Sequence, residues 1–180
     1  MNEREPKKKS VAMEWIQTIV VAILLAALIK HFIFNTTMVM GHSMEPTLHE
    51  GDRMICLVFP LYYSDPEYGD IVIVKSPLKG DGRDFVKRVV GRPGDVLDLK
   101  DGVFTRNGKV VKEPYIAEDA TTENIQGNHW ELGENQFFVV GDNRYPGMSE
   151  DSRAFGPIDK KTIHSIAKLR YYPFSAMGSV

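Results

Sequence analysis

A serine and a lysine in two separate short motifs are the side chains with the clearest chemical potential in this chain. Ser43 lies in GHSMEPTL, which spans residues 41–48, and Lys87 lies in DFVKRVVGRPGD, which spans residues 84–95. A serine hydroxyl is a weak nucleophile until a base removes its proton, and a lysine amine can be that base only when it is neutral. The two motifs therefore indicate hydrolysis by a serine nucleophile with a lysine general base.

The sequence around Lys87 favours burial, which a lysine base requires. Strand alternation puts Lys87 on one face of its segment and Arg88 on the other, each between two apolar residues. Only the lysine can act as a base, because a guanidinium is not deprotonated in proteins. Lowering a lysine pKa from about 10.4 to about 8 costs roughly 3.3 kcal/mol, which burial can supply. Lys75 is the competing lysine, but it ends the segment DIVIVK beside Ser76-Pro77, where exposure is expected.

Other nucleophiles and bases fit the sequence less well. Taken alone, Ser43 would be a structural serine and Lys87 a solvated side chain on a sheet face. Neighbours on an extended segment point in opposite directions, so His42 is poorly placed to serve Ser43 in a Ser-His-Asp triad. Cys56 lies in MICLVF, which is typical of a buried strand, so its thiol is expected to pack rather than react. The five histidines show no metal-ligand spacing, and we expect neither a metal nor a cofactor.

A third motif, GDNRYPGMSEDSRAFGPI over residues 141–158, completes a pattern. The three motifs, in this order, resemble those of the bacterial type I signal peptidases, which are Ser/Lys proteases, and in particular the Gram-positive branch. The resemblance implies that Ser43 is the nucleophile and Lys87 the general base. It also implies a mainly β catalytic domain of coiled sheets that removes signal peptides from exported preproteins without a cofactor.

The resemblance further implies supporting roles for the third motif. The family pattern G-D-N-R-x-x-S-x-D-S-R supplies a serine that hydrogen-bonds the lysine and an Asp/Arg pair that holds the loop. The matching residues here are Ser149, Asp142, Asp151 and Arg153. Between Arg144 and Ser149 this chain has two residues more than the family's usual spacing, so Ser152 is a second candidate for the lysine's partner. Pro146-Gly147 predicts a surface turn that bulges outward, and the two aspartates could instead be ordinary turn caps.

The tetrahedral intermediate of such a reaction requires hydrogen-bond donors for its oxyanion. The backbone N–H of Ser43 is a natural donor. The resemblance implies that some family members add a hydroxyl side chain two positions earlier, where this chain has Gly41, which offers only backbone. The full set of donors is therefore open.

An apolar stretch over residues 11–34 precedes the motifs and is itself preceded by a basic tail over residues 1–10. The tail holds four lysines and arginines, whereas Lys30 is the only one between the start of the apolar stretch and Arg53. Because positive residues concentrate on the cytoplasmic side of a span, this asymmetry predicts a single-pass anchor with a cytoplasmic N-terminus. The rest of the chain is expected outside the cytoplasmic membrane.

A cleavable signal peptide is the alternative interpretation of the apolar stretch. Its uncharged core over residues 16–29 would span only about 21 Å as a helix, against a hydrocarbon thickness of roughly 30 Å. The following residues, KHFIFNTT, offer no small-x-small cleavage site, however, and apolar flanks can lengthen the span. We therefore expect an uncleaved anchor.

Residues 35–180 are predicted to form one extracytoplasmic catalytic domain that is mainly β. Runs of β-branched and aromatic residues predict strands at 70–75, 85–90, 96–99, 136–140 and 165–171. Asn107-Gly108 between VFT and KVV is a type I′ hairpin signal. Residues 112–132 lack clear periodicity and are interpreted as a peripheral excursion.

The amino-acid composition is consistent with this organisation and gives information on the class of partner. The 180 residues carry a net charge of −2 with 43% hydrophobic residues, which gives no indication of nucleic-acid binding. The expected partners are the signal peptides of secretory preproteins and lipid of the cytoplasmic membrane, and the expected state is a monomer. Two alternatives are an inactive membrane-anchored homologue that binds preproteins, and a Ser/Lys self-cleaving peptidase of the repressor type, which normally carries a DNA-binding part.

Overall fold

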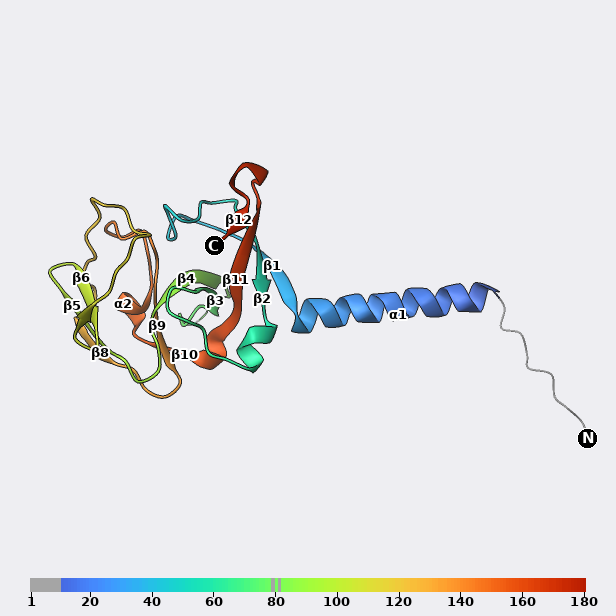
Figure 1. The fold of residues 1–180 in the computed structure, drawn as a ribbon, viewed down its shortest axis with the longest axis horizontal. Helices are drawn as coiled ribbons and strands as arrows, with labels where there is room; N and C mark the ends of the chain where they lie inside the picture. Colours follow the sequence, from blue (N-terminus) through green and yellow to red (C-terminus); the bar gives the residue numbers. More distant parts are fainter. Residues whose placement is uncertain (1–10, 79, 81) are drawn as a thin grey trace, which may run out of the picture.

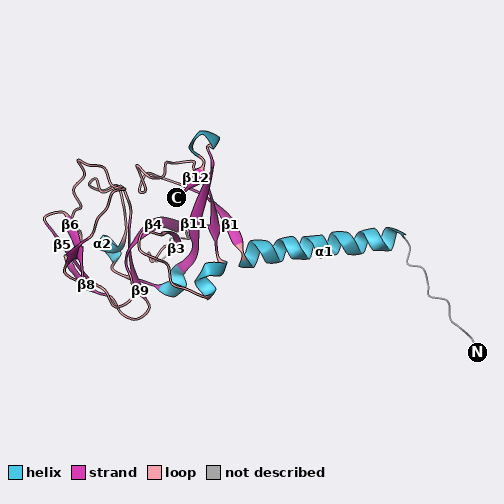
Figure 2. Cartoon of the chain, viewed as in Figure 1, coloured by secondary structure: helices cyan, strands magenta, loops and turns pink. Residues whose placement is uncertain are grey.

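One long helix extends from a body of β-sheets in the computed structural model of the chain (Figure 1). The structure describes residues 11–78, 80 and 82–180, so the predicted basic tail over residues 1–10 lies outside the described residues. Helix α1 (Val11–Phe32) projects away from the strands, which gather at its C-terminal end. Figure 2 shows the same division between one long helix and a body of strands and loops. The predicted fold class, mainly β behind one N-terminal helix, is confirmed.

Apolar composition explains both the helical form of α1 and its exposure. By length and composition, Val11–Lys30 can cross a membrane, and none of it is buried by the rest of the protein. An α-helix satisfies its own backbone hydrogen bonds, which a hydrocarbon environment requires. The helix ends at Phe32 and not at Phe34, where the apolar stretch ends in the sequence. The reason is that Phe34 already pairs with Leu57 as the first residue of a strand.

The larger sheet combines strands from both ends of the described chain. Its order is β1-β2-β11-β3-β4-β9-β10, with β12 paired to β11. The strands are β1 (Phe34–Met38), β2 (Arg53–Leu57), β3 (Ile71–Lys75), β4 (Asp84–Gly91), β9 (Gln136–Val140), β10 (Ile158–Asp159), β11 (Ile163–Tyr172) and β12 (Gly178–Ser179). All of these pairs are antiparallel, and the order places β4 next to β9, which leads into the third motif.

The smaller sheet has the order β7-β6-β5-β8. Its strands are β5 (Val96–Lys100), β6 (Val103–Arg106), β7 (Lys109–Val110) and β8 (His129–Glu131). The predicted hairpin is confirmed, because Asn107 and Gly108 connect β6 to β7 with φ angles of 52° and 74°. Positive φ at both central residues is what a type I′ turn requires. Phe104 and Trp130 of this sheet pack against Phe138 of β9, so the two sheets share one apolar cluster.

Short helices close the ends of the sheets. They are η1 (Phe59–Tyr62), α2 (Ser152–Phe155), η2 (Lys160–Thr162) and η3 (Phe174–Ala176). Of these, α2 matters most for the site. It directly follows Asp151 of the third motif, which caps the helix by accepting a hydrogen bond from the Arg153 N–H.

All five predicted strand segments are present as β3, β4, β5, β9 and β11. The interpretation of residues 112–132 as a peripheral excursion is wrong. The side chains of Glu113 and Thr122 reach the buried guanidinium of Arg144, and the excursion also contains β8. The segment makes these contacts with a loop some twenty to thirty residues later in the chain. Such long-range contacts leave no periodic pattern in the segment's own sequence.

Candidate active site

Ser43 lies in a turn between β1 and β2 that is anchored in the core. Met44 and Leu48 are fully buried, and the Leu48 N–H donates to the Met44 carbonyl (2.9 Å). Gly41 has a φ of 81°, a conformation that residues with a side chain rarely adopt, and it turns the chain just before Ser43. The buried residues therefore hold the turn, while Ser43 stays half-buried and lines a cavity.

Lys87 reaches Ser43 from the middle of β4. The Lys87 Nζ lies 2.7 Å from the Ser43 Oγ, within hydrogen-bond distance. Lys87 is only 3% exposed, and Val72 on β3 is its partner in the sheet register. The ring centroid of Phe85, on the same face of β4, lies 5.4 Å from the Nζ. The structure thus brings together the two residues that the sequence singles out as nucleophile and base.

Burial is the main cause of an altered pKa at Lys87. It lowers the pKa of this amine from 10.5 to about 8. The carboxylates of Asp151, Glu150 and Asp142 act in the opposite direction, while the charge of Arg153 adds to the lowering. In the part of the chain that the structure describes, no carboxylate forms an ion pair with Lys87. A substantial fraction of the amine is therefore neutral slightly above neutral pH.

A cavity of about 570 Å³ contains both side chains. Its walls are two extended segments, residues 37–44 and 83–87, together with side chains from the loops that carry Glu50, Met148 and Glu150. Four methionines line it: Met38, Met40, Met44 and Met148. Methionine side chains are flexible and polarizable, so such a wall adapts to differing apolar side chains. Another cavity, of about 440 Å³ between η1 and η2, contains neither Ser43 nor Lys87.

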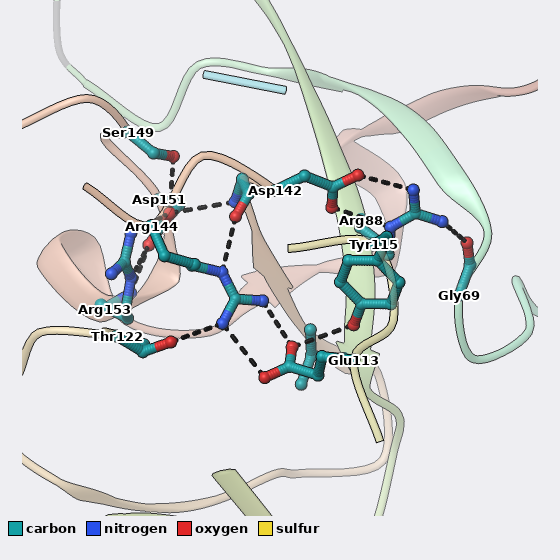
Figure 3. A network of polar contacts seen from close by, with 12 residues as sticks. Gly69, Arg88, Glu113, Tyr115, Thr122, Asp142, Arg144, Ser149, Asp151 and Arg153 are labelled. Atoms are coloured by element: carbon teal, nitrogen blue, oxygen red, sulfur yellow. Dashed lines mark hydrogen bonds and ion pairs between the residues drawn. The ribbon is translucent and has the colours of Figure 1, made fainter. Parts of the chain in front are cut away.

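Asp151 organises the loop beside this pair of residues. It is fully buried and accepts hydrogen bonds from the Arg153 guanidinium (2.9 and 2.8 Å), the Gly141 N–H (3.0 Å) and the Ser149 hydroxyl (2.6 Å). Burial acts to raise the pKa of Asp151, but the Arg153 charge and these hydrogen bonds outweigh it, so the pKa is lowered. Asp151 is thus an ionised centre of the loop as well as a helix cap (Figure 3).

Ser149 lies next to the main chain of the nucleophile, but its hydroxyl has a different partner from the one expected. A Cβ built on Gly141 would lie 2.2 Å from the Ser149 Oγ and 2.4 Å from the Ser43 carbonyl oxygen. Among the described residues no hydrogen bond joins Ser149 to Lys87, the contact that the resemblance implies. The Ser149 hydroxyl donates to Asp151 instead, because a carboxylate is a stronger acceptor than an amine that already lies against Ser43.

Ser152, the other candidate for the lysine's partner, has a structural role. Its side chain is fully buried, and its Oγ accepts a hydrogen bond from the Val139 N–H of β9 (3.0 Å). This contact ties α2 to the larger sheet. Of the two serines, Ser149 is therefore the one beside the nucleophile.

Asp142 forms a buried ion pair with Arg88, a residue to which the sequence reasoning assigned no role. The Arg88 guanidinium donates two hydrogen bonds to the Asp142 carboxylate (2.8 and 2.6 Å) and one to the Gly69 carbonyl (Figure 3). The Thr47 hydroxyl also donates to Asp142 (2.6 Å), which links the third motif to the turn that carries Ser43. Asp142 is therefore not an ordinary turn cap. Strand alternation was the signal for Arg88, since it placed a cation on the face opposite Lys87.

Asn143 is a second residue that sequence reasoning missed. Its backbone N–H donates to the Ser43 carbonyl (3.0 Å), and its side-chain amide donates to the His42 carbonyl (2.9 Å). These two bonds attach the third motif directly to the nucleophile's segment. The available signal was its position inside the GDNR half of the third motif.

The extra residues before Ser149 do not simply bulge outward. Tyr145 and Met148 close a turn through a backbone hydrogen bond (3.1 Å), and the Tyr145 hydroxyl donates to Asp119. Met148 then lines the cavity that contains Ser43. The outward bulge predicted for Pro146-Gly147 is corrected to this extent, because the turn returns an apolar side chain to the cavity wall.

The competing nucleophiles and bases lie elsewhere. The His42 Nδ1 lies 2.9 Å from Glu45, Cys56 is fully buried in β2, and Lys75 is exposed at the end of β3. No histidine among the described residues contacts the Ser43 hydroxyl. Within the same residues no group of three or more histidine, cysteine, aspartate or glutamate side chains is arranged to hold a metal ion.

The Ser43 backbone N–H is available to an oxyanion. No hydrogen bond within residues 11–78, 80 and 82–180 uses it as a donor. Gly41 adds no side-chain donor, as the sequence indicates. The arrangement as a whole can generate a serine nucleophile, accept its proton and stabilise one developing negative charge.

Known proteins are similar to this chain over nearly its whole length. The family model described as "Signal peptidase, peptidase S26" matches residues 12–172. Signal peptidase I S of Bacillus subtilis (strain 168) is 39% identical over 185 residues, which cover 98% of this chain and 97% of that protein. Signal peptidase I of Bacillus licheniformis is 37% identical over 181 residues, covering 96% of this chain and 95% of that protein. A solved signal peptidase I from Enterococcus faecalis superposes with a TM-score of 0.47 at 25% identity, over 57% of this chain and 97% of that chain.

Proposed function

Since the chain belongs to the signal peptidase family, peptidase S26, we propose that it releases signal peptides from exported preproteins with Ser43 as nucleophile and Lys87 as general base. Membership makes the chain a serine peptidase, and its relatives are named signal peptidase I. The observation that carries the assignment of the two residues is the 2.7 Å distance between the Lys87 Nζ and the Ser43 Oγ in a buried setting. Among the described residues that line the cavity, Ser43 is the only serine and Lys87 the only lysine.

The reaction follows from this geometry in two halves. The Ser43 hydroxyl attacks the carbonyl carbon of the last signal-peptide residue while its proton moves to the neutral Nζ of Lys87. The Ser43 N–H donates to the oxyanion, and Lys87 then returns the proton to the nitrogen of the departing mature chain as the C–N bond breaks. In the second half Lys87 takes a proton from water, whose oxygen attacks the acyl carbon. The bond between that carbon and the Ser43 Oγ then breaks, and Lys87 returns the proton to the Oγ as the signal peptide leaves.

An unpaired stretch of β4 supports extended binding of the substrate. β4 pairs with β3 from Asp84 to Arg88, but its described pairs with β9 begin only at Arg88. On that side, residues 84–87 have no strand partner among the described strands, and these residues line the cavity. An extended peptide can add to such an edge through main-chain hydrogen bonds. The substrate's cleavage site would thereby lie along the edge that ends at Lys87.

We further propose that α1 remains as a single-pass anchor, with the N-terminus in the cytoplasm and the catalytic domain outside. The apolar helix supports an anchor, and the basic residues at positions 4 and 7–9 support this orientation. A preprotein whose signal peptide sits in the same membrane would then present its cleavage site close to the membrane surface. The relatives do not favour the two alternatives, an inactive preprotein-binding homologue and a self-cleaving repressor-type peptidase. They are named signal peptidase I, and the match covers nearly their full length.

The test is the cleavage of a secretory precursor by the detergent-solubilised full-length protein and its variants. Ser43→Ala and Lys87→Ala should each abolish release of the signal peptide without unfolding the domain, because each removes a group that the chemistry requires. Lys87→Arg should be equally inactive, since a guanidinium cannot act as the base. Lys75→Ala, which changes an exposed lysine at the end of β3, is the matched control and should retain activity. Near-normal turnover by folded Ser43→Ala or Lys87→Ala would reject the proposal.

A further inference from the structure

The third motif contains a fully buried guanidinium, that of Arg144. Arg144 is 0% exposed, and its Nε donates to the Gly141 carbonyl (2.8 Å), the residue that links β9 to the loop beside Ser43. A buried charge is costly unless it is paired and its donors are satisfied. The partners of Arg144 therefore decide whether this loop keeps its position.

Those partners come from the segment that the sequence left as a peripheral excursion. The Glu113 carboxylate, whose side chain is only 7% exposed, accepts hydrogen bonds from both terminal nitrogens of Arg144. The Thr122 hydroxyl accepts a third from the Nη1 (2.7 Å). The Tyr115 hydroxyl donates to Glu113 (2.9 Å), and burial, reinforced by the Glu113 charge, raises the pKa of Tyr115, which keeps this hydroxyl a donor. Figure 3 shows these side chains converging on the Arg144 guanidinium.

The same loop holds the nucleophile's main chain. From Gly141 the chain continues to Asn143, whose backbone N–H donates to the Ser43 carbonyl (3.0 Å). Gly141 itself is so close that a Cβ there would lie 2.4 Å from the Ser43 carbonyl oxygen. A displacement of Gly141 is therefore transmitted to Ser43 by direct contact. Because a misplacement of about 1 Å can cost about a hundredfold in rate, the anchor of this loop bears on the chemistry.

A second contact connects the excursion to the other side of the site. The Tyr115 ring lies 4.1 Å from the Cζ of Arg88, the partner of Asp142. Asp142 in turn accepts the hydroxyl of Thr47 in the nucleophile's turn (2.6 Å). The excursion thus contacts the Gly141–Asn143 loop through Glu113 and Arg144. It is connected to the turn that carries Ser43 through Tyr115, Arg88 and Asp142.

We propose that Glu113, acting through Arg144, is a positioning residue for the Ser43 nucleophile, and that the excursion is a brace for the catalytic loop. Glu113 contacts neither Ser43 nor Lys87 and lies outside the cavity, so its role is to fix the Gly141–Asn143 backbone against which Ser43 rests. The inference rests on the proposed function, since it presupposes that Ser43 is the nucleophile.

The principal variant is Glu113→Gln, which keeps the shape of the side chain and removes the charge that compensates Arg144. With the full-length protein and a precursor peptide, we expect kcat to fall about ten- to a hundredfold while KM changes by less than about threefold. The break in the pH profile of kcat/KM should stay where it is in the unaltered protein, because Glu113 does not contact Lys87. Folded fraction is measured by circular dichroism, and kcat is expressed per folded molecule.

Further variants keep the test decisive if Glu113→Gln folds poorly. Thr122→Val removes one hydrogen bond to Arg144 and leaves the ion pair, so a smaller fall in kcat of about three- to tenfold is expected. The double variant Glu113→Gln with Arg144→Gln should be no slower than the slower single variant, because both residues act along one path. Glu118→Gln changes an exposed carboxylate of the same segment and is the matched control, expected within about twofold of the unaltered protein.

The outcomes separate this inference from the proposed function. If folded Glu113→Gln and Thr122→Val both keep kcat within about twofold, or lose activity only through KM, the positioning role is overturned. If kcat falls but the pH break moves with it, Glu113 acts on the base and the inference is also overturned. If Ser43→Ala remains active in the same assay, the proposed nucleophile fails instead, whatever Glu113→Gln does.

Discussion

At the scale of single residues, the proposed chemistry depends on how deeply Lys87 is buried. The sequence reasoning required a pKa of about 8 for a useful base, and burial in the structure lowers the pKa of Lys87 from 10.5 to about 8. Burial penalises the charged form of the amine, and this is what leaves enough of it neutral to accept a proton. Lys87 therefore costs stability as the pH falls below its ordinary pKa of 10.5, and this cost is complete below about 8, where the buried amine also carries a proton.

This pKa leads to an expected pH dependence. Below about 8 the amine is protonated and cannot accept the Ser43 proton, so kcat/KM should fall by about tenfold per pH unit there and reach a plateau above it. The measurement is kcat/KM for a precursor peptide from pH 6 upward on the full-length protein in detergent. Lys75→Ala should show the same profile, since that lysine is exposed and outside the cavity. A break near 6.5, the ordinary pKa of histidine, would point to a different base.

The two serines of the third motif should differ in what they affect. Ser149 lies beside the main chain of Ser43 and donates to the buried Asp151 carboxylate, so Ser149→Ala should lower kcat by about ten- to a thousandfold and should also lower the unfolding temperature, because a hydrogen bond to a charge is lost. Ser152→Ala leaves the buried Val139 N–H without its acceptor, which should cost about 1–3 kcal/mol of stability while kcat per folded molecule falls less. Thermal unfolding and single-turnover kinetics measured on the same preparations separate the two. A silent Ser149→Ala with a damaging Ser152→Ala would reverse the assignment.

Residue type alone predicted the two main side chains of the candidate site, whereas their supporting contacts required the folded structure. Ser43 and Lys87 could be singled out because only certain side chains perform acyl transfer, and strand alternation separated Lys87 from Arg88. The partner of the Ser149 hydroxyl could not be predicted from the sequence. Asp151, two positions later, and the Lys87 amine, from a distant motif, were both possible acceptors. Only the folded loop shows that Asp151 takes this hydrogen bond.

At the scale of elements, the strongest local sequence patterns predicted secondary structure correctly, whereas long-range contacts could not be predicted. Runs of β-branched and aromatic residues predicted β3, β4, β5, β9 and β11, and Asn107-Gly108 predicted the hairpin. The short strands β1, β8, β10 and β12 are specified by pairing with distant residues rather than by their own composition. The excursion around Glu113 and Thr122 was misjudged for the same reason, since both side chains hydrogen-bond to Arg144 in a later loop.

The junction between β9 and the catalytic loop should tolerate no side chain at Gly141. A Cβ there would lie 2.2 Å from the Ser149 Oγ and 2.4 Å from the Ser43 carbonyl oxygen, and the second of these is backbone that cannot rotate away. Gly141→Ala should therefore displace the nucleophile and lower kcat by about a hundredfold or more. Gly178→Ala is the matched control, because a Cβ at that position would meet nothing within 4 Å. Comparable kcat values for the two folded variants would contradict this account of the junction.

At the scale of the whole molecule, the chain divides into an apolar helix and a catalytic body with a direct connection. α1 ends at Phe32 and β1 begins at Phe34, so no flexible linker separates the helix from the sheet that carries the site. If α1 spans the membrane, the start of the larger sheet must lie close to the membrane surface. The smaller sheet, with the hairpin of β6 and β7, lies at the opposite end of the body from α1 (Figure 1).

The proposed orientation of the chain in the membrane rests on charge, and single cysteines can test it. The chain has one cysteine, Cys56, which is fully buried and should not react with a membrane-impermeant maleimide until the protein is denatured. Lys109→Cys places an exposed thiol on the hairpin far from α1, and it should be labelled in intact cells or protoplasts. Ser10→Cys places a thiol beside the basic residues at positions 7–9 and should be labelled only after lysis, because those residues favour the cytoplasmic side. Labelling of Ser10→Cys but not Lys109→Cys in intact cells would show the reverse orientation. Loss of the N-terminal segment from the purified protein, detected by mass spectrometry, would instead show that the apolar stretch is cleaved.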